Sequence, residues 1–404
     1  GFRYIGPLDG HNLPMLMGAI RYAKEADQPI LLHVLTKKGK GYAPAEADPT
    51  KFHGIAPLPT EPETIPPTER LPTYTEIFGK TVLKLADLDR NIVAITAAMA
   101  EGTGLTEFSK KYPQRFYDVG IAEEHAVTFA AGLATQGLRP IVAIYSTFLQ
   151  RAYDQIVHDV CLQKLPVIFA LDRGGIVGED GATHGGVFDY SYLRHIPELV
   201  VMAPKDENEL QHMFYTATKH PGPVSIRYPR GLCQGVALDQ QFQIMEIGKA
   251  ELVYRSPYRI LPNKPRPKKI TLAAIGTMVS TALTAAKQLE QEGFLLTVIN
   301  ARFVKPLDNT LILEEANSSD LLVTVEENVA AGGFGSAILE LLAENNVQVK
   351  TKCLAIPDEF IIQGSPEEVR AYYQLDSAGI VQRIRTALQP TESSINKASS
   401  TGSR

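Results

Sequence analysis

Short apolar runs rich in β-branched residues alternate with helix-like segments through the middle of the chain. The runs lack a clean apolar-polar alternation, which is typical of strands buried on both faces. Strands that alternate with helices predict an α/β fold with a parallel sheet flanked by helices. We expect Ser146 or Thr147 to cap one of these helices and Asp206 to cap another. The strand-like runs are NIVAITAAM (91–99), IVAIY (141–145), PVIFALD (166–172), LVVMAP (199–204) and PVSIRYPRG (223–231).

Polar side chains gather directly after these predicted strands. Glu123, Glu124 and His125 stand between a strand that ends near Val119 and an apolar helix. Acids are also favoured in the first turn of any helix, so this cluster alone does not identify a site. However, the carboxyl ends of parallel strands meet at one edge of a sheet, where open α/β folds bind ligands. Further polar residues at such ends are Tyr145, Arg151, Arg173, Asp180, His184 and Arg230.

Length and composition indicate a globular chain of two or three domains. It has 404 residues, of which 44% are apolar, and a net charge of −5 that gives no indication of nucleic-acid binding. The three cysteines are widely spaced and form no metal or disulfide pattern, so we expect a reducing compartment such as the cytoplasm. We find neither a signal peptide nor an apolar run of membrane-spanning length.

Two proline-rich stretches predict the domain boundaries. Residues 54–73 carry six prolines, and we expect 54–70 to be an extended linker. We expect 241–269 to be a second linker; its end, 254–269, has six Lys or Arg and four prolines. That basic stretch fits either an anion-binding loop or a solvated loop. A second α/β unit is expected over 270–388, and a disordered Ser/Thr-rich tail over 389–404.

Seven segments together resemble the 1-deoxy-D-xylulose-5-phosphate synthase family of transketolase-like thiamine diphosphate enzymes. They occur in the family's order over about residues 1–388. The resemblance implies that 1–53 ends a diphosphate-binding domain, that 71–240 is the pyrimidine-binding domain and that 270–388 is the transketolase C-terminal domain. The segments are YIGPLDGH (4–11), TKKGKGY (36–42), IAEEHAVTFAAG (121–132), IYSTFLQRAYDQ (144–155), DRGGIVGEDGATHGG (172–186), RYPRG (227–231) and TVEENVAAGGFGS (324–336).

The resemblance also implies roles for individual residues. Glu123 matches the family's catalytic carboxyl, which hydrogen-bonds the aminopyrimidine of the cofactor, whereas Glu124 is expected to be a helix-start acid. Phe148 is expected to stack on the aminopyrimidine. The remaining assignments are to proton handling and the reacting carbon (His184, Asp180 and His11) and to substrate binding (Tyr145, Arg173, Arg230 and Arg151).

The implied reaction is the condensation of pyruvate with D-glyceraldehyde 3-phosphate, with loss of carbon dioxide, to 1-deoxy-D-xylulose 5-phosphate. This transferase step opens the non-mevalonate route to isoprenoids and also supplies thiamine and pyridoxal synthesis. The implied cofactors are thiamine diphosphate and Mg²⁺. A homodimer is expected, without nucleic-acid or membrane partners, in a bacterial cytoplasm or a plastid stroma.

The sequence departs from the family in one respect. The family holds magnesium through a Gly-Asp-Gly motif followed by an Asn, and nothing in this chain matches that pattern. We therefore expect no metal site in this chain, an N-terminally truncated sequence and no activity of the chain alone. Two alternatives remain: a non-catalytic or split subunit that needs a separate diphosphate-binding chain, and the beta subunit of a 2-oxo-acid dehydrogenase.

Overall fold

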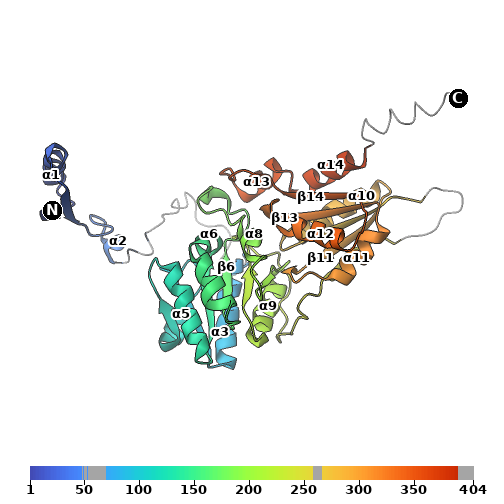
Figure 1. The fold of residues 1–404 in the computed structure, drawn as a ribbon, viewed down its shortest axis with the longest axis horizontal. Helices are drawn as coiled ribbons and strands as arrows, with labels where there is room; N and C mark the ends of the chain where they lie inside the picture. Colours follow the sequence, from blue (N-terminus) through green and yellow to red (C-terminus); the bar gives the residue numbers. More distant parts are fainter. Residues whose placement is uncertain (48, 50–51, 53–69, 258–265, 390–404) are drawn as a thin grey trace. The chain divides into compact units, whose positions relative to one another are not determined.

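The computed structural model describes residues 1–47, 49, 52, 70–257 and 266–389 (Figure 1). The chain divides into two compact units, residues 1–70 and 71–404, and each is described by itself. Most of the expected 54–70 linker, half of the basic stretch and nearly all of the expected disordered tail lie outside the described residues. Within the described ranges, no helix is long and apolar enough to cross a membrane.

The first unit is a small βαβ arrangement. Strand β1 (Arg3–Asp9) pairs in parallel with β2 (Ile30–Leu35), and helix α1 (Leu13–Glu25) connects them. A short helix, α2 (Ala43–Ala47), follows. The sequence predicts a helix over residues 13–25 and a strand over PILLHVLT (29–36), and the structure has both. Strand β1 was not expected, because Gly6 and Pro7 interrupt its apolar pattern and its register shifts between Ile5 and Leu8.

The second unit begins with a seven-stranded sheet, which confirms the expected α/β fold. Its strand order is β12-β7-β8-β6-β5-β3-β4. All neighbours pair in parallel except β12, which runs antiparallel to β7 at the edge. The strands are β3 (Ile92–Thr96), β4 (Phe116–Asp118), β5 (Arg139–Tyr145), β6 (Ile168–Asp172), β7 (Val200–Met202), β8 (Val224–Arg227) and β12 (Phe303–Lys305).

Alternate residues of these strands feed two separate cores, because side chains point to opposite faces of a sheet. On one face, Val142 and Phe169 pack with α5 (Glu123–Thr135) and the π-helical turn η3 (Ile156–Cys161). On the other face, Ile141 and Ile168 pack with α3 (Tyr74–Leu88) and α9 (Glu207–Lys219). The central strands are therefore buried on both faces, as their continuous apolar sequence indicates. Shorter helices of this part are α4 (Thr106–Lys111), α6 (Ser146–Leu149), α7 (Tyr153–Gln155) and α8 (Asp189–Leu193).

A five-stranded sheet forms the C-terminal part of the second unit. Its order is β14-β13-β10-β11-β9, with β9 antiparallel and the others parallel. The strands are β9 (Glu251–Arg255), β10 (Lys269–Ala274), β11 (Leu295–Asn300), β13 (Leu321–Val329) and β14 (Thr351–Ile356). The helices are α10 (Met278–Gln291), α11 (Asn309–Ser318), α12 (Phe334–Glu344), α13 (Pro366–Tyr372) and α14 (Ser377–Leu388).

Three local expectations differ from the structure. The presumed linker 241–269 contains β9, which joins the second sheet, so this part is not a connector. The apolar sequence FLLTVINARFV (294–304) predicts one strand, but it forms two strands in different sheets, because the backbone turns at Arg302, whose φ is 59°. Neither Ser146 nor Thr147 caps a helix, since α6 starts after Tyr145 without a side-chain cap. The predicted cap at Asp206 is confirmed.

Candidate active site

The site forms where strands β5 and β6 of the parallel sheet end. Tyr145 is the last residue of β5, and α6, which carries Phe148, follows at once. Asp172 is the last residue of the neighbouring strand β6, and Arg173 comes next. Since Tyr145 pairs in register with Asp172, the two polar strand ends lie side by side. The sheet topology thus brings together residues that the sequence keeps 20 or more positions apart.

Aromatic rings connect several of the predicted residues. The rings of Tyr145 and Phe148 stack at 5.8 Å with an interplanar angle of 11°. The ring of His184 meets Phe148 edge-on at 5.4 Å. The Arg173 guanidinium lies 4.2 Å from the centre of the Tyr145 ring, a cation–π distance. Burial raises the pKa of the Tyr145 phenol to about 12, so the group is a neutral hydroxyl at ordinary pH.

Glu123 is a buried carboxylate in the first turn of α5. Its exposure is 3%, whereas the adjacent Glu124 is exposed. Arg151 donates from Nη1 to Oε1 of Glu123 at 3.0 Å. The same guanidinium lies 5.4 Å from the centre of the Phe148 ring. Arg151 therefore connects the carboxylate to the aromatic group, and these three predicted residues lie together.

Arg173 is held by a buried partner. Its Nη1 lies 3.0 Å from Oδ1 of Asp172, and it also donates to the carbonyl oxygen of Gly102 at 2.7 Å. Thr75 donates to Oδ2 of Asp172 at 2.7 Å. Burial raises the pKa of Asp172, and the Arg173 charge is the largest opposing influence. Part of the Arg173 charge therefore neutralises Asp172, which sequence reasoning did not identify as a functional residue.

Arg230 and Asp180 form the second pair of predicted residues. Nη1 of Arg230 donates to Oδ2 of Asp180 at 2.8 Å, and Glu179 lies 3.8 Å from Nη2. The side chain of Arg230 is 37% exposed, more than the 16% of Arg173. Both charges act on the pKa of Tyr145, which places this pair near the ring cluster. Arg230 is therefore the more accessible of the two arginines for a solvent-borne anion.

His11 belongs to the first unit and is described with it. Its Nε2 accepts a hydrogen bond from the backbone N–H of Lys37 at 2.8 Å, which orients the ring. The backbone N–H of His11 donates to Oδ1 of Asp9 at 2.9 Å. The assignment of His11 to the reacting carbon stays a prediction.

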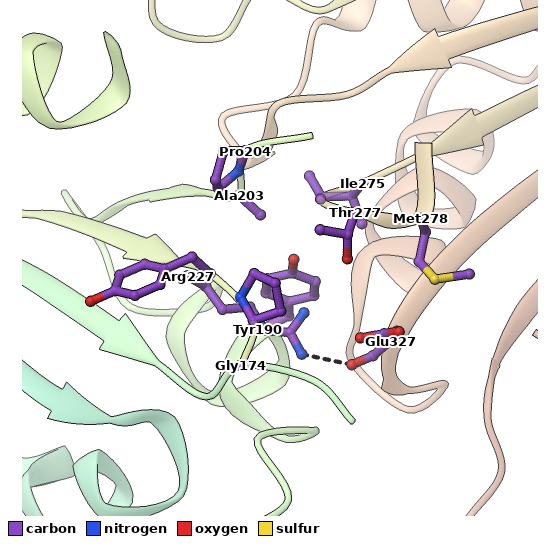
Figure 2. A pocket seen from close by; sticks show the side chains of 12 residues that line it. Gly174, Tyr190, Ala203, Pro204, Arg227, Ile275, Thr277, Met278 and Glu327 are labelled. Atoms are coloured by element: carbon purple, nitrogen blue, oxygen red, sulfur yellow. Dashed lines mark hydrogen bonds between the residues drawn. The ribbon is translucent and has the colours of Figure 1, made fainter. Parts of the chain in front are cut away.

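A buried ionic network behind the site was not predicted. Arg227 is 5% exposed; its Nε lies 3.1 Å from Oδ2 of Asp189, and its Nη2 donates to the carbonyl oxygens of Gly186 and Glu327. Figure 2 shows the hydrogen bond between Arg227 and Glu327, two residues that line a small pocket. Ser146 in turn donates to Asp189 at 2.8 Å. A sequence signal existed: Arg227 is a charged residue inside an otherwise apolar strand, and such residues are buried only with partners.

This network fixes both ends of the loop that carries Asp180 and His184. Gly175 and Gly186 exchange backbone hydrogen bonds of 2.7 and 2.9 Å, which close the loop at its base. The Arg227 bond to Gly186 attaches that base to strand β8. Ser146 connects the same network to the start of α6, next to Tyr145. The loop and the ring cluster therefore share one buried support.

The residues fit the pyrimidine end of thiamine diphosphate. Glu123 offers a buried carboxylate in the first turn of a helix, and Phe148 offers an aromatic ring beside it. These are the two groups that an aminopyrimidine needs, a hydrogen-bond partner for a ring nitrogen and a stacking surface. Among the described residues, no group of three or more His, Cys, Asp or Glu side chains is placed to hold a metal ion.

Comparisons with known proteins agree with this geometry. Residues 71–235 match the family description "Transketolase, pyrimidine binding domain", 263–380 match "Transketolase, C-terminal domain", and 1–36 match "1-deoxy-D-xylulose-5-phosphate synthase". The 1-deoxy-D-xylulose-5-phosphate synthase of Desulforudis audaxviator is 56% identical over 95% of this chain. A Geobacter sulfurreducens enzyme of that name is 54% identical over 94%. The chain spans 58% of the length of each of these two relatives.

Solved structures give the same fold. A "Split gene transketolase, inactive beta4 tetramer" superposes with a TM-score of 0.68 at 29% identity, covering 78% of this chain and 98% of its own. Campylobacter jejuni transketolase superposes with a TM-score of 0.64 at 17% identity, covering 96% of this chain and 67% of its own, and supports the fold alone. Taken with the sequence matches, which run in order from residue 1 to residue 380, these likenesses show that the chain is similar to the 1-deoxy-D-xylulose-5-phosphate synthases and has the fold of transketolase-like enzymes.

Proposed function

We propose that the enzyme that contains this chain condenses pyruvate with D-glyceraldehyde 3-phosphate to 1-deoxy-D-xylulose 5-phosphate and carbon dioxide. One observation carries the proposal: a single line of contacts runs from the buried Glu123 through Arg151, Phe148 and Tyr145 to Arg173. At one end, Glu123 and Phe148 offer a carboxylate and an aromatic ring to an aminopyrimidine. At the other end, Arg173 and Tyr145 offer a cation and a hydroxyl group to a phosphorylated aldehyde. Relatives more than half identical over this region carry the name of this enzyme.

Glu123 and Phe148 are the residues that would hold the cofactor, thiamine diphosphate, which is used with Mg²⁺ in this family. When bound, the cofactor supplies a carbon nucleophile that accepts the pyruvate-derived unit. The role of Glu123 is to hold a proton against the aminopyrimidine ring nitrogen, because a buried carboxyl is a directional partner there. Arg151 keeps this side chain oriented, and Phe148 excludes water from the adjacent ring face.

Arg230, with Tyr145 and Arg173, is proposed to bind the acceptor phosphate. A guanidinium suits a phosphate because its fork of N–H donors makes two parallel hydrogen bonds. Arg230 is the more exposed arginine, and a phosphate would compete with Asp180 for it. Displacement of Asp180 would free a carboxylate next to the reacting groups. Asp180 and His184 are therefore proposed to hold and move the proton at the acceptor carbonyl oxygen.

The activity is assigned to an enzyme that also contains the part of the family's sequence that this chain does not cover, called the full-length enzyme below. That part is proposed to hold Mg²⁺ and the diphosphate, since the family's Gly-Asp-Gly motif does not occur in these 404 residues. The split-gene transketolase that resembles 78% of this chain is described as inactive. We propose that this chain on its own is inactive as well. A homodimer in the cytoplasm is proposed for the full-length enzyme.

The decisive experiment is a two-acceptor assay of the full-length enzyme. Arg230→Ala should raise the KM for glyceraldehyde 3-phosphate by one to two orders of magnitude, the scale of one lost charge-assisted contact of about 1.5–3 kcal/mol. The KM for unphosphorylated glyceraldehyde should hardly change. An equal loss with both acceptors would mean that Arg230 does not bind the phosphate.

A further inference from the structure

A pocket of about 590 Å³ lies in the C-terminal part of the second unit, between the start of β14 and the last turns of α14. The charged residues that line it are all cations, Lys350, Lys352 and Arg383, and no carboxylate lines it among the described residues. None of its lining residues belongs to the candidate active site. The other polar residues that line it are two threonines and three glutamines, Thr351, Thr386, Gln374, Gln382 and Gln389.

Arg383 is a partly buried cation without a carboxylate partner in the part of the chain that the structure describes. Burial lowers the pKa of its guanidinium, and no neighbouring charge opposes the shift. Among the described residues, its side chain makes one hydrogen bond, from Nη1 to the carbonyl oxygen of Tyr373 at 3.5 Å, the outer limit for such a bond. Most N–H donors of the Arg383 guanidinium therefore have no acceptor among the described residues and can bind a ligand.

Three other arginines that are at least partly buried have carboxylate partners. Arg173 lies 3.0 Å from Asp172, Arg227 3.1 Å from Asp189, and Arg370 donates to Glu327 at 2.5 Å. These pairs follow the general rule that a buried charge is compensated. Within the described residues, Arg383 has neither a carboxylate partner nor a hydrogen bond shorter than 3.5 Å, so its charge is available to a ligand.

The two lysines add to the same uncompensated charge. Lys350 directly precedes β14, the edge strand of the five-stranded sheet, and Lys352 is the second residue of that strand. Neither forms an ion pair with a carboxylate among the described residues, unlike Lys269 of the same sheet, which pairs with Glu315 at 2.8 Å. Three like charges around one pocket repel one another, and a multivalent anion removes that repulsion.

We propose that this pocket binds a small polyanion that carries at least two phosphate-type charges. The inference goes beyond the proposed reaction, which uses none of these residues. The guanidinium fork of Arg383 suits a bidentate phosphate contact, and Lys350 and Lys352 suit a second charged group. The amide side chains match the remaining oxygen atoms or hydroxyl groups of the ligand. The volume lies within the usual range for small-molecule sites.

The test is a calorimetric titration of the 404-residue chain with inorganic pyrophosphate. Arg383→Gln and Lys352→Gln should each weaken binding by at least about tenfold, the scale of one lost charge-assisted contact. Arg385→Gln is the matched control, because Arg385 lies two residues along the same helix but pairs with Glu292 and does not line the pocket. That variant should bind pyrophosphate like the unmodified chain.

A fourth variant separates this pocket from the active site. Arg230→Gln removes the accessible cation of that site and should leave pyrophosphate binding unchanged. The proposal is overturned if Arg230→Gln abolishes binding, or if Arg383→Gln and Lys352→Gln leave it intact. Thermal unfolding without ligand checks the fold: Arg383→Gln should be no less stable than the unmodified chain, since it removes an uncompensated charge. Pyrophosphate should then raise the melting temperature of the unmodified chain and not that of Arg383→Gln.

Discussion

Arg151 and Glu123 form an ion pair of 3.0 Å between a half-exposed guanidinium and a carboxylate whose side chain is 4% exposed. The pair connects α5 to the segment that follows α6. The half-exposed side chain of Arg151 can rotate into solvent, whereas the buried side chain of Glu123 cannot. The Glu123 carboxylate therefore stays in place when a ligand replaces Arg151 as its partner. Glu123, and not its neighbour Glu124, therefore has the placement that a fixed proton-holding group requires.

Replacing Glu123 should cost the full-length enzyme most of its turnover. We expect Glu123→Gln to lower kcat by roughly 10²–10⁴-fold, the usual contribution of a positioned acid or base. Glu124→Gln is the control, and it should lose far less because its side chain is exposed. Steady-state rates and melting temperatures of both variants check this. Equal losses of turnover at equal stability would show that the wrong carboxylate was chosen.

The two candidate phosphate arginines should differ in stability. Arg173→Ala leaves Asp172 fully buried without its cation, and removal of one partner of a buried pair costs about 3–5 kcal/mol. Arg230→Ala breaks a partly exposed pair with Asp180, for which about 0–1 kcal/mol is typical. Urea unfolding of the 404-residue chain measures both. A similar small effect of the two substitutions would mean that Asp172 is protonated or solvated in the native chain.

The sequence predicts the centre of the fold better than its edges. The central strands β5 and β6 are buried on both faces, so their apolar runs are unambiguous. Strands β1 and β9 were missed because they are half-exposed and interrupted or flanked by Gly, Pro and basic residues. Whether such a segment becomes a strand depends on a partner strand far along the chain, which local pattern does not reveal.

The site residues of the second unit were predictable as a group but not in their pairing. The topology rule placed Tyr145, Arg173 and His184 at one sheet edge, and they do lie in one cluster. It did not predict that Arg173 would pair with the residue just before it. Nor did it predict the ion pair of Arg227 with Asp189, because charged partners on separate elements are set by packing. The roles assigned to these residues remain predictions.

Glu326 should make the chain less stable as the pH rises toward neutrality. It is fully buried and accepts hydrogen bonds of 2.7 Å from the backbone N–H groups of Phe334 and Gly335. Burial raises the pKa of Glu326 to about 7, from 4.5. Between these two values the folded chain keeps a proton that the unfolded chain has lost. The stabilisation is therefore complete below about pH 4.5 and is lost as the pH rises through about 7, by about 3 kcal/mol in total.

Glu326→Gln tests this pH dependence, because it removes the titrating group. The free energy of unfolding of the unmodified chain, relative to the variant, should fall by about 3 kcal/mol between pH 4.5 and pH 8. Glu344→Gln serves as the control: Glu344 is exposed at the C-terminal end of α12, the helix whose first N–H groups donate to Glu326, and this variant should follow the unmodified chain. A constant difference between Glu326→Gln and the unmodified chain across this range would contradict the assignment.

Gly186 should not tolerate a side chain, because it lies at the closed base of the loop that carries Asp180 and His184. A Cβ atom at this position would lie 2.3 Å from the carbonyl oxygen of Arg173 and 2.8 Å from Oγ of Ser146. Since the first neighbour is backbone, Gly186→Ala has to displace the loop base or strand β6. We expect a loss of about 1–3 kcal/mol of stability and faster hydrogen exchange over 175–186.

Gly132→Ala is the matched control: a Cβ there meets nothing within 4 Å in helix α5, so it should raise stability by up to about 1 kcal/mol. If Gly186→Ala exchanges its loop amides as slowly as Gly132→Ala, the loop base is not the rigid support inferred from Arg227 and Asp189.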